Sequence, residues 1–236
     1  MIRILKGNIF NSKCDCIVNT VNCVGFMGKG IALEMSLRYP EMEAIYKEKC
    51  RKGEIQIGEL WIYEEKKGEK KKILNFPTKK DYKKPSKEEY ILKGLEEFRK
   101  KYRSYGIKSI AFPLLGAQNG KLSSGRVLEI MKQKLGDLED LEVEIYVFDL
   151  KEYVRDSLFM DFVSYLEMHA GNPKNARIKE AIKMRSELRN FADIVEMKIP
   201  FEEEGGGVRR VSIATKTYIQ KIVSEIKNSG KQMSLF

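Results

Sequence analysis

Histidine is almost absent from this chain. The 236 residues include one histidine, His169, in a segment with helical periodicity far from the glycine-rich parts of the sequence. Sites that pair serine or cysteine with histidine, and metal sites built on histidine, are therefore disfavoured. We expect no metal site, and any chemistry has to use lysine, carboxylate, amide or backbone groups.

Paired cysteines and long apolar runs are also missing. The four cysteines, at positions 14, 16, 23 and 50, form no CxxC pair, which predicts reduced structural thiols. No apolar run approaches the ~20 residues of a membrane span. The amino-terminal segment MIRILKGNIF lacks the long apolar centre of a signal peptide. We therefore expect a cytoplasmic protein with no membrane partner.

Positive charge is plentiful but local. Residues 66–108 hold 16 Lys+Arg and 6 Asp+Glu, a surplus equal to the formal net charge of +10 for the whole chain. A lysine-rich run is usually a solvated face. Because one segment carries the entire surplus, the sequence favours a surface for a polyanion, with nucleic acid first.

Strand-like and helix-like segments alternate through residues 1–150. We expect strands at 2–5, 16–19, 60–63, 72–76, 108–113 and 143–148, and helices at 30–37, 41–50, 86–105 and 123–135, the last two capped by Ser86 and by Ser123 or Ser124. This order predicts an α/β sheet covered on both faces. Ligands of such sheets bind beyond the carboxyl ends of the strands.

The alternation ends after Asp149. Helical periodicity runs through 153–168, 176–195 and 208–226. We therefore expect a domain over residues 1–150, a helical extension over 151–230 and a flexible tail at 231–236. With 42% hydrophobic residues, the chain is apolar enough to form a packed core.

Two glycine-rich loops follow predicted strands. The first lies in VNTVNCVGFMGKGIA at 18–32, and the second is LLGAQNGKL at 114–122. The pattern GxxxxGK[ST] fails, because Gly28-Lys29 is followed by Gly30 and not by serine or threonine. The pattern GxGxxG fails, because Gly28-Lys29-Gly30 leads to Leu33. Two such loops can present several backbone N–H groups to one diphosphate. The Asn22 amide can donate to and accept from a sugar hydroxyl, with a plain turn or capping asparagine as the alternative.

Three separated motifs resemble the macrodomain family. They are residues 14–33, the segment NFPTK at 75–79, and residues 109–122. The branch they are most similar to is that of the DNA ADP-ribosyl glycohydrolases, the DarG antitoxins. The resemblance covers about residues 1–150 and leaves out 151–236. It implies a three-layer α/β/α fold with a mixed sheet that binds ADP-ribose and needs no cofactor.

The resemblance also implies which residues hold ADP-ribose. Asn8 is expected at the adenine amino group, Phe148 beside the adenine and Asn22 at the distal ribose, while the two loops wrap the diphosphate. The expected set is Asn8, Ile9, Asn22, Gly25, Met27, Gly28, Lys29, Gly30, Ile31, Thr78, Leu115, Gly116, Ala117, Gln118, Asn119, Gly120, Lys121, Leu122 and Phe148.

Catalysis is expected at Lys79 together with Asn22. Lys79 matches the lysine to which the branch assigns catalysis, and its neighbour Lys80 is the alternative. An ammonium at Lys79 would stabilise or protonate the departing base, whereas a neutral amine would attack the anomeric carbon. Gly120 stands where the related terminal ADP-ribose glycohydrolase has an aspartate, which argues against the complete covalent mechanism of that enzyme.

The expected function follows from these residues and the basic segment. Nucleic-acid contacts are expected from Lys80, Tyr82, Lys83, Lys84 and Lys87. The leading hypothesis is a hydrolase that removes ADP-ribose from DNA, with a thymidine-type linkage favoured, and so reverses the modification made by a cognate toxin. The alternatives are a non-catalytic ADP-ribose reader, an ADP-ribosyl-protein hydrolase, and an interaction protein whose helical tail neutralises a toxin.

The chain ends in QMSLF, which resembles the bacterial sliding-clamp-binding peptide. A glutamine and spaced apolar side chains, here Gln232, Leu235 and Phe236, can dock in a hydrophobic pocket. Pentapeptides recur by chance, and a tail without a partner is the alternative. The sequence thus adds the sliding clamp as an expected partner.

Overall fold

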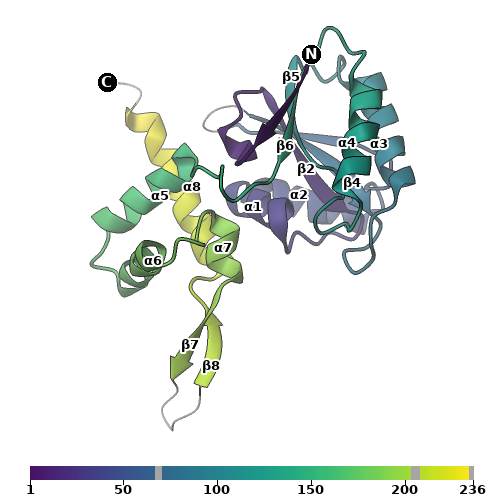
Figure 1. The fold of residues 1–236 in the computed structure, drawn as a ribbon. Coiled ribbons are helices and arrows are strands. Elements are labelled where there is room, and N and C mark those ends of the chain that lie inside the picture. The colour runs from purple at the N-terminus through teal and green to yellow at the C-terminus, as the bar shows by residue number, and fades with distance from the viewer. Residues whose placement is uncertain (67–70, 203–207, 234–236) are drawn as a thin grey trace. The chain divides into compact units, whose positions relative to one another are not determined.

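The computed structural model describes residues 1–66, 71–202 and 208–233. The chain divides into two compact units, unit 1 at residues 1–153 and unit 2 at residues 154–236 (Figure 1). The glycine-rich loops and the basic segment belong to unit 1.

Unit 1 is built on a six-stranded mixed sheet. Its strand order is β1 (Ile2–Lys6), β6 (Glu142–Val147), β5 (Ser109–Pro113), β2 (Cys16–Asn22), β4 (Lys72–Lys79) and β3 (Trp61–Glu64). The first five strands are parallel to their neighbours, and β3 runs antiparallel to β4. A 3₁₀ helix, η1 (Ile9–Asn11), follows β1. The mixed sheet expected from the resemblance is confirmed.

Helices cover both faces of this sheet. Helices α1 (Gly30–Arg38) and α2 (Pro40–Arg51) pack through Met35, Met42 and Tyr46 onto one face. Helices α3 (Glu88–Lys101) and α4 (Ser124–Leu135) lie side by side on the other face (Figure 1), where Phe98 packs on Phe112. Side chains of β2 enter both cores, as expected for a strand buried on two faces. The three-layer α/β/α fold is confirmed.

The structure of unit 1 differs from the sequence-based prediction in the length of β4 and in the cap of α3. Strand β4 runs on from Phe76 to Lys79, because it stays paired with β2 as far as Asn22. Pro77 is tolerated there because β3 begins at Trp61, opposite Asn75, and does not pair with Pro77. Ser86 is not the cap of α3. Lys87 holds that position, and Ser86 is instead buried, with its N–H donating to the Gly120 carbonyl at 2.9 Å. Ser123 does cap α4, because its hydroxyl accepts from the Arg126 N–H.

Unit 2 holds helices and one hairpin. Its elements are α5 (Ser157–Met168), α6 (Pro173–Met184), α7 (Phe191–Glu196), β7 (Lys198–Glu202), β8 (Val208–Ser212) and α8 (Lys216–Met233). The helix expected over 176–195 is interrupted, since a capping box of Asn190 and Asp193 starts α7. The prediction of a helix from Val208 is wrong over residues 208–212, because these residues form β8 and pair antiparallel with β7.

The core of unit 2 is aromatic, with a buried amide beside it. The rings of Phe159, Phe162 and Phe191 lie within 5.2–6.1 Å of one another. The Asn175 Oδ1 accepts from the Tyr218 hydroxyl at 2.8 Å, and its Nδ2 donates to the His169 carbonyl at 3.1 Å. The backbone carbonyl of the single histidine therefore takes part in a structural hydrogen-bond network. Of the expected tail, Lys231 to Met233 form the end of α8, and Leu235 and Phe236 lie outside the described residues.

Within the described residues, no helix has both the length and the apolar character that are needed to cross a membrane.

Two helix glycines give a matched test of the packing on α3. A Cβ at Gly94 in α3 would lie 2.2 Å from the Phe76 ring, whereas a Cβ at Gly125 in α4 meets nothing within 4 Å. Gly94→Ala should lower the free energy of unfolding by about 1–3 kcal/mol through overpacking. Gly125→Ala should raise it by about 0.5–1 kcal/mol, because alanine favours the helix. Urea unfolding followed by circular dichroism measures both, and equal stabilisation would contradict the packing.

Candidate functional site

The expected site residues lie where parallel strands end. Asn8 follows β1, the first loop (residues 23–29) follows β2, Lys79 ends β4, the second loop (residues 114–122) follows β5, and Phe148 follows β6. Since β1, β6, β5, β2 and β4 are parallel, their carboxyl ends meet at one edge of the sheet. Asn22 and Lys79 are register partners across β2 and β4. The strand pairing thus brings together segments that are far apart in the sequence.

The first loop is organised by the Asn22 side chain. Its Oδ1 accepts from the N–H groups of Val24 at 3.0 Å and Phe26 at 3.2 Å, and its Nδ2 donates to the Phe26 carbonyl at 2.6 Å. The buried Tyr46 hydroxyl donates to the Asn22 carbonyl at 2.6 Å. Asn22 is only 6% exposed. The structure therefore gives Asn22 the turn role considered as the alternative, and its contact with a ribose stays a prediction.

The second loop is folded tightly on itself. The Leu122 N–H donates to the Gly116 carbonyl at 3.1 Å, and the Gly116 backbone has a φ of +69°. A Cβ at Gly120 would lie 2.1 Å from the Gly116 carbonyl oxygen and 2.4 Å from the Ser86 hydroxyl. Position 120 therefore admits only glycine on this backbone path. An aspartate, which the resemblance led us to compare with Gly120, would not fit on this backbone path.

The two loops and Lys79 meet at Asn119. The Lys79 Nζ donates a hydrogen bond to the Asn119 carbonyl. The exposed Asn119 side chain lies beside Gly30, with its Nδ2 2.6 Å from the position of a Cβ there, and the Gly30 φ of +54° favours glycine. Lys80 is exposed, and its Nζ lies 6.0 Å from the centre of the Tyr90 ring. The contact with the second loop is thus made by Lys79.

Lys79 is electrostatically perturbed. Partial burial, and then the nearby Lys121 ammonium, lower the pKa of Lys79 from its ordinary value. Lys121 has a φ of +64°, and among the described residues it is the non-glycine residue with a positive φ. Its N–H donates to the Gln118 carbonyl at 3.1 Å. A lysine is therefore held in a strained backbone conformation beside the expected catalytic amine.

The remaining expected ligand residues differ in exposure. Buried positions are Asn8, Ile9, Met27, Thr78, Leu115, Gly116 and Gly120, while exposed positions include Lys29, Gln118, Asn119, Lys121 and Phe148. The Asn8 Oδ1 accepts from the Phe10 N–H at 3.0 Å and caps η1. Phe148 is no core residue, because about half of it is exposed and its ring meets Tyr153 edge-on at 5.8 Å.

The expected nucleic-acid residues lie between β4 and α3. Lys80, Tyr82, Lys83, Lys84 and Lys87 are all exposed in this short connection, which begins directly after Lys79. The Tyr82 ring packs on Phe26 of the first loop, with 4.5 Å between their centroids. Phe26 is absent from the residues expected from sequence. A large aromatic side chain within a glycine-rich loop was the signal that could have found it.

The thiols of unit 1 are not poised for nucleophilic chemistry. Burial raises the pKa of Cys23 to about 11, and the pKa values of Cys14, Cys16 and Cys50 are also raised by burial. The thiol form therefore dominates near neutral pH. Among the described residues, no three His, Cys, Asp or Glu side chains gather in a way that could hold a metal ion.

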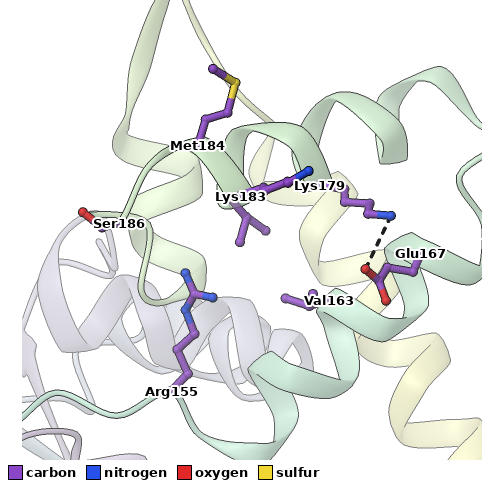
Figure 2. A pocket seen from close by; sticks show the side chains of 8 residues that line it. Arg155, Val163, Glu167, Lys179, Lys183, Met184 and Ser186 are labelled. Carbon is purple, nitrogen blue, oxygen red and sulfur yellow. Dashed lines mark ion pairs between the residues drawn. The ribbon is translucent and has the colours of Figure 1, made fainter.

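Unit 2 contains an open groove of about 490 Å³. Figure 2 shows Lys179 and Lys183 of α6 with Glu167 of α5 and Arg155 before it. The Lys179 ammonium pairs with the Glu167 carboxylate at 3.4 Å, and Arg155 donates to the Leu188 carbonyl at 2.9 Å. Both cations thus already have partners within unit 2.

Unit 1 is similar in sequence and structure to several known proteins. A family model described as the Macro domain matches residues 18–131. The DNA ADP-ribosyl glycohydrolase of Thermus aquaticus is 37% identical over 147 residues, which are 62% of this chain and 41% of that protein. The solved macrodomain of Mycobacterium tuberculosis DarG is 40% identical with a TM-score of 0.60, and the match covers 62% of this chain and 97% of that one.

The chain belongs to the macrodomain family. A third match is the structure of Thermosipho africanus DarTG in complex with ADP-ribose, which is 30% identical with a TM-score of 0.60 over 66% of this chain and 43% of that one. The resemblance to DNA ADP-ribosyl glycohydrolases that the motifs predicted is confirmed. The chain spans about two-fifths of the length of the curated relative named above.

Lys121 provides a test of the electrostatics at Lys79. Lys121→Gly should raise the pKa of Lys79, because a neighbouring cation is removed, and should stabilise the protein by about 1 kcal/mol, because the left-handed strain is relieved. Lys121→Ala removes the same charge but keeps the backbone strain. Both variants should shift the Lys79 titration equally, as followed by NMR of labelled lysine side chains, and only the glycine variant should unfold at higher urea. An unchanged titration in both would rule out the influence of Lys121.

Proposed function

We propose that this chain is a hydrolase that removes ADP-ribose from ADP-ribosylated DNA, with a thymidine-type linkage favoured. The observation that carries the proposal is the hydrogen bond from the Lys79 ammonium to the Asn119 carbonyl. It places an amine with a lowered pKa where the two glycine-rich loops approach each other. The name of the Thermus aquaticus relative supports the same activity.

ADP-ribose is proposed to lie along this edge of the sheet. In this proposal the two loops bind the diphosphate through main-chain N–H groups, as loops at strand ends commonly do. Phe148 supplies an exposed ring for the adenine, and Asn8 lies after β1, the strand that pairs with β6 before Phe148. The presence of ADP-ribose in the Thermosipho africanus DarTG structure supports the ligand.

The proposed reaction breaks the C–N bond between the distal ribose and the base. Positive charge develops on the ribose and negative charge on the departing base. The Lys79 ammonium donates its proton to the base, water adds to the anomeric carbon and releases a proton to solvent, and the lysine amine takes up a proton from solvent. A lowered pKa assists the donation, because it brings the amine closer to the pH at which the protein works.

The wider biological role is part of the same proposal. Removal of ADP-ribose from DNA would reverse the action of a cognate ADP-ribosyltransferase toxin, the expected partner of the DarG branch.

The sliding clamp stays a predicted partner, because Leu235 and Phe236 lie outside the described residues. Recovery of the clamp with the full chain, and with a variant that carries Gln232→Ala, is the direct test of that interaction. Equal recovery would exclude a role for the peptide.

Cleavage of an ADP-ribosylated thymidine oligonucleotide tests the activity. Lys79→Ala should lower the cleavage rate by about 100- to 10,000-fold, because the general acid is lost. Lys80→Ala is the control: it should keep most of kcat, because the contact with the second loop is made by Lys79, and it should weaken substrate binding, because Lys80 is among the expected nucleic-acid contacts. A wild-type protein that binds the oligonucleotide and leaves it intact would be a reader and not a hydrolase.

The pH dependence separates the two roles of the lysine. If the ammonium is the acid, the cleavage rate should fall as pH rises through the lowered pKa of Lys79, below the range of an ordinary lysine. If the neutral amine attacks the anomeric carbon, the rate should rise over that interval, and borohydride should trap an adduct on Lys79. Rate profiles of the wild-type protein, with mass spectrometry after borohydride treatment, distinguish these outcomes.

A further inference from the structure

Two aromatic side chains lie exposed and in contact beside the candidate site. Phe26 of the first loop is 48% exposed and Tyr82 is 43% exposed. Their ring centroids are 4.5 Å apart, with 42° between the ring planes. Single exposed aromatic residues are common, but two that pack on each other and remain open form a small apolar surface.

The backbone holds Phe26 firmly in this exposed position. The Asn22 side chain bonds both the N–H and the carbonyl of Phe26, at 3.2 and 2.6 Å. The Phe26 ring lies over Gly28, where a Cβ would come within 2.2 Å of the ring. Glycine at position 28 therefore leaves the room that the ring occupies. The exposure of Phe26 is built into the loop.

Hydrogen bonds of the neighbouring residues hold the backbone at Tyr82 in place. The Cys23 N–H donates to the Lys80 carbonyl at 3.2 Å, which ties the first loop to the chain just before Tyr82. Asp81 closes the turn that carries Tyr82, because its Oδ1 accepts from the Lys83 N–H at 2.8 Å and its carbonyl accepts from the Lys84 N–H at 3.1 Å. Both rings are thus presented by hydrogen-bonded backbone.

The surroundings of the pair are cationic. The Lys83 Nζ lies 5.6 Å from the centre of the Tyr82 ring. Lys80, Lys83 and Lys84 are exposed, and within the described part of the chain none of the three forms an ion pair with a carboxylate. Aromatic faces combined with unpaired cations match single-stranded nucleic acid, whose bases stack and whose phosphates need neutralisation.

We propose that the Phe26–Tyr82 pair is a stacking platform for an unpaired base that flanks the ADP-ribosylated nucleotide in single-stranded DNA. This inference rests on the proposed function. The topology supports it, because Tyr82 follows Lys79 by three residues and Phe26 follows Asn22, the register partner of Lys79, by four. A nucleotide that reacts at Lys79 therefore has its neighbour close to the platform. The preference for single strands follows, since both faces of a base inside a duplex are already stacked on its neighbours.

Binding of labelled oligonucleotides tests the platform whether or not the protein cleaves them. Fluorescence anisotropy would compare a single-stranded oligonucleotide with the same strand carrying abasic flanking sites. Tyr82→Leu and Phe26→Leu should each weaken binding of the first about tenfold, as expected for the loss of one stacked base. For the abasic strand the two variants should bind like the wild-type protein, because no base is left to stack.

Control variants separate stacking from charge and from loss of folding. Tyr82→Phe should restore the affinity, because it keeps the ring, and Ile45→Ala, which alters an equally exposed side chain on α2, should have no effect. Tyr82→Leu should leave the salt dependence of binding unchanged, whereas Lys83→Ala should reduce its slope by about 0.7, the value for one phosphate contact on a single strand. Circular dichroism of each variant verifies the fold.

The outcomes distinguish the platform from the proposed activity. Equal weakening for the intact and the abasic strand, or no weakening for either, would overturn the platform even if the wild-type protein cleaves its substrate. Failure to cleave, together with base-dependent binding through Tyr82, would instead overturn the hydrolase proposal and leave the platform standing. Equal dependence on Tyr82 for duplex and single strand would also contradict the platform.

Discussion

The parallel pairing of β2 with both β4 and β5 is the constraint on which the candidate site depends. It puts the first loop, Lys79 and the second loop beyond three adjacent strand ends. Helices packed on both faces bury these strands, so the relative positions of their ends are fixed by core packing. Hydrogen bonds within each loop then fix its path, and the bond between Lys79 and Asn119 joins the end of β4 to the second loop.

A single buried amide links this core to the surface of the site. Asn22 ends β2, receives a hydrogen bond from Tyr46 of α2, and bonds the backbone on both sides of the Phe26 Cα. Packing of α2 on the sheet is thereby coupled to the position of an exposed ring. The same residue type that binds a sugar hydroxyl also suits this structural task, because an amide both donates and accepts. Its two uses are therefore indistinguishable in the sequence.

The sequence predicts the strand and helix order of unit 1 and both loops, because strand periodicity and glycine placement are local signals. Lys79 is indicated only by the resemblance of NFPTK to the family motif, and its catalytic role stays a prediction. Prediction from sequence fails for features that depend on contacts between residues far apart in the sequence. Val208–Ser212 has a pattern compatible with a helix and becomes β8 only through pairing with β7. Ser86 has the sequence position of a cap, but the second loop covers it and Lys87 takes that place. The contact of Phe26 with Tyr82 joins two loops from different strands, which no local pattern reveals.

The crowding at Gly120 limits how this loop can change. The carbonyl of Gly116 and the hydroxyl of Ser86 occupy the space that any side chain at position 120 would enter. An acidic residue therefore cannot be introduced there by one replacement while the backbone keeps its path. Gly116, Ser86 and the connection between them would have to move together. A carboxylate at position 120 thus requires a rebuilt loop and cannot arise through a single codon change.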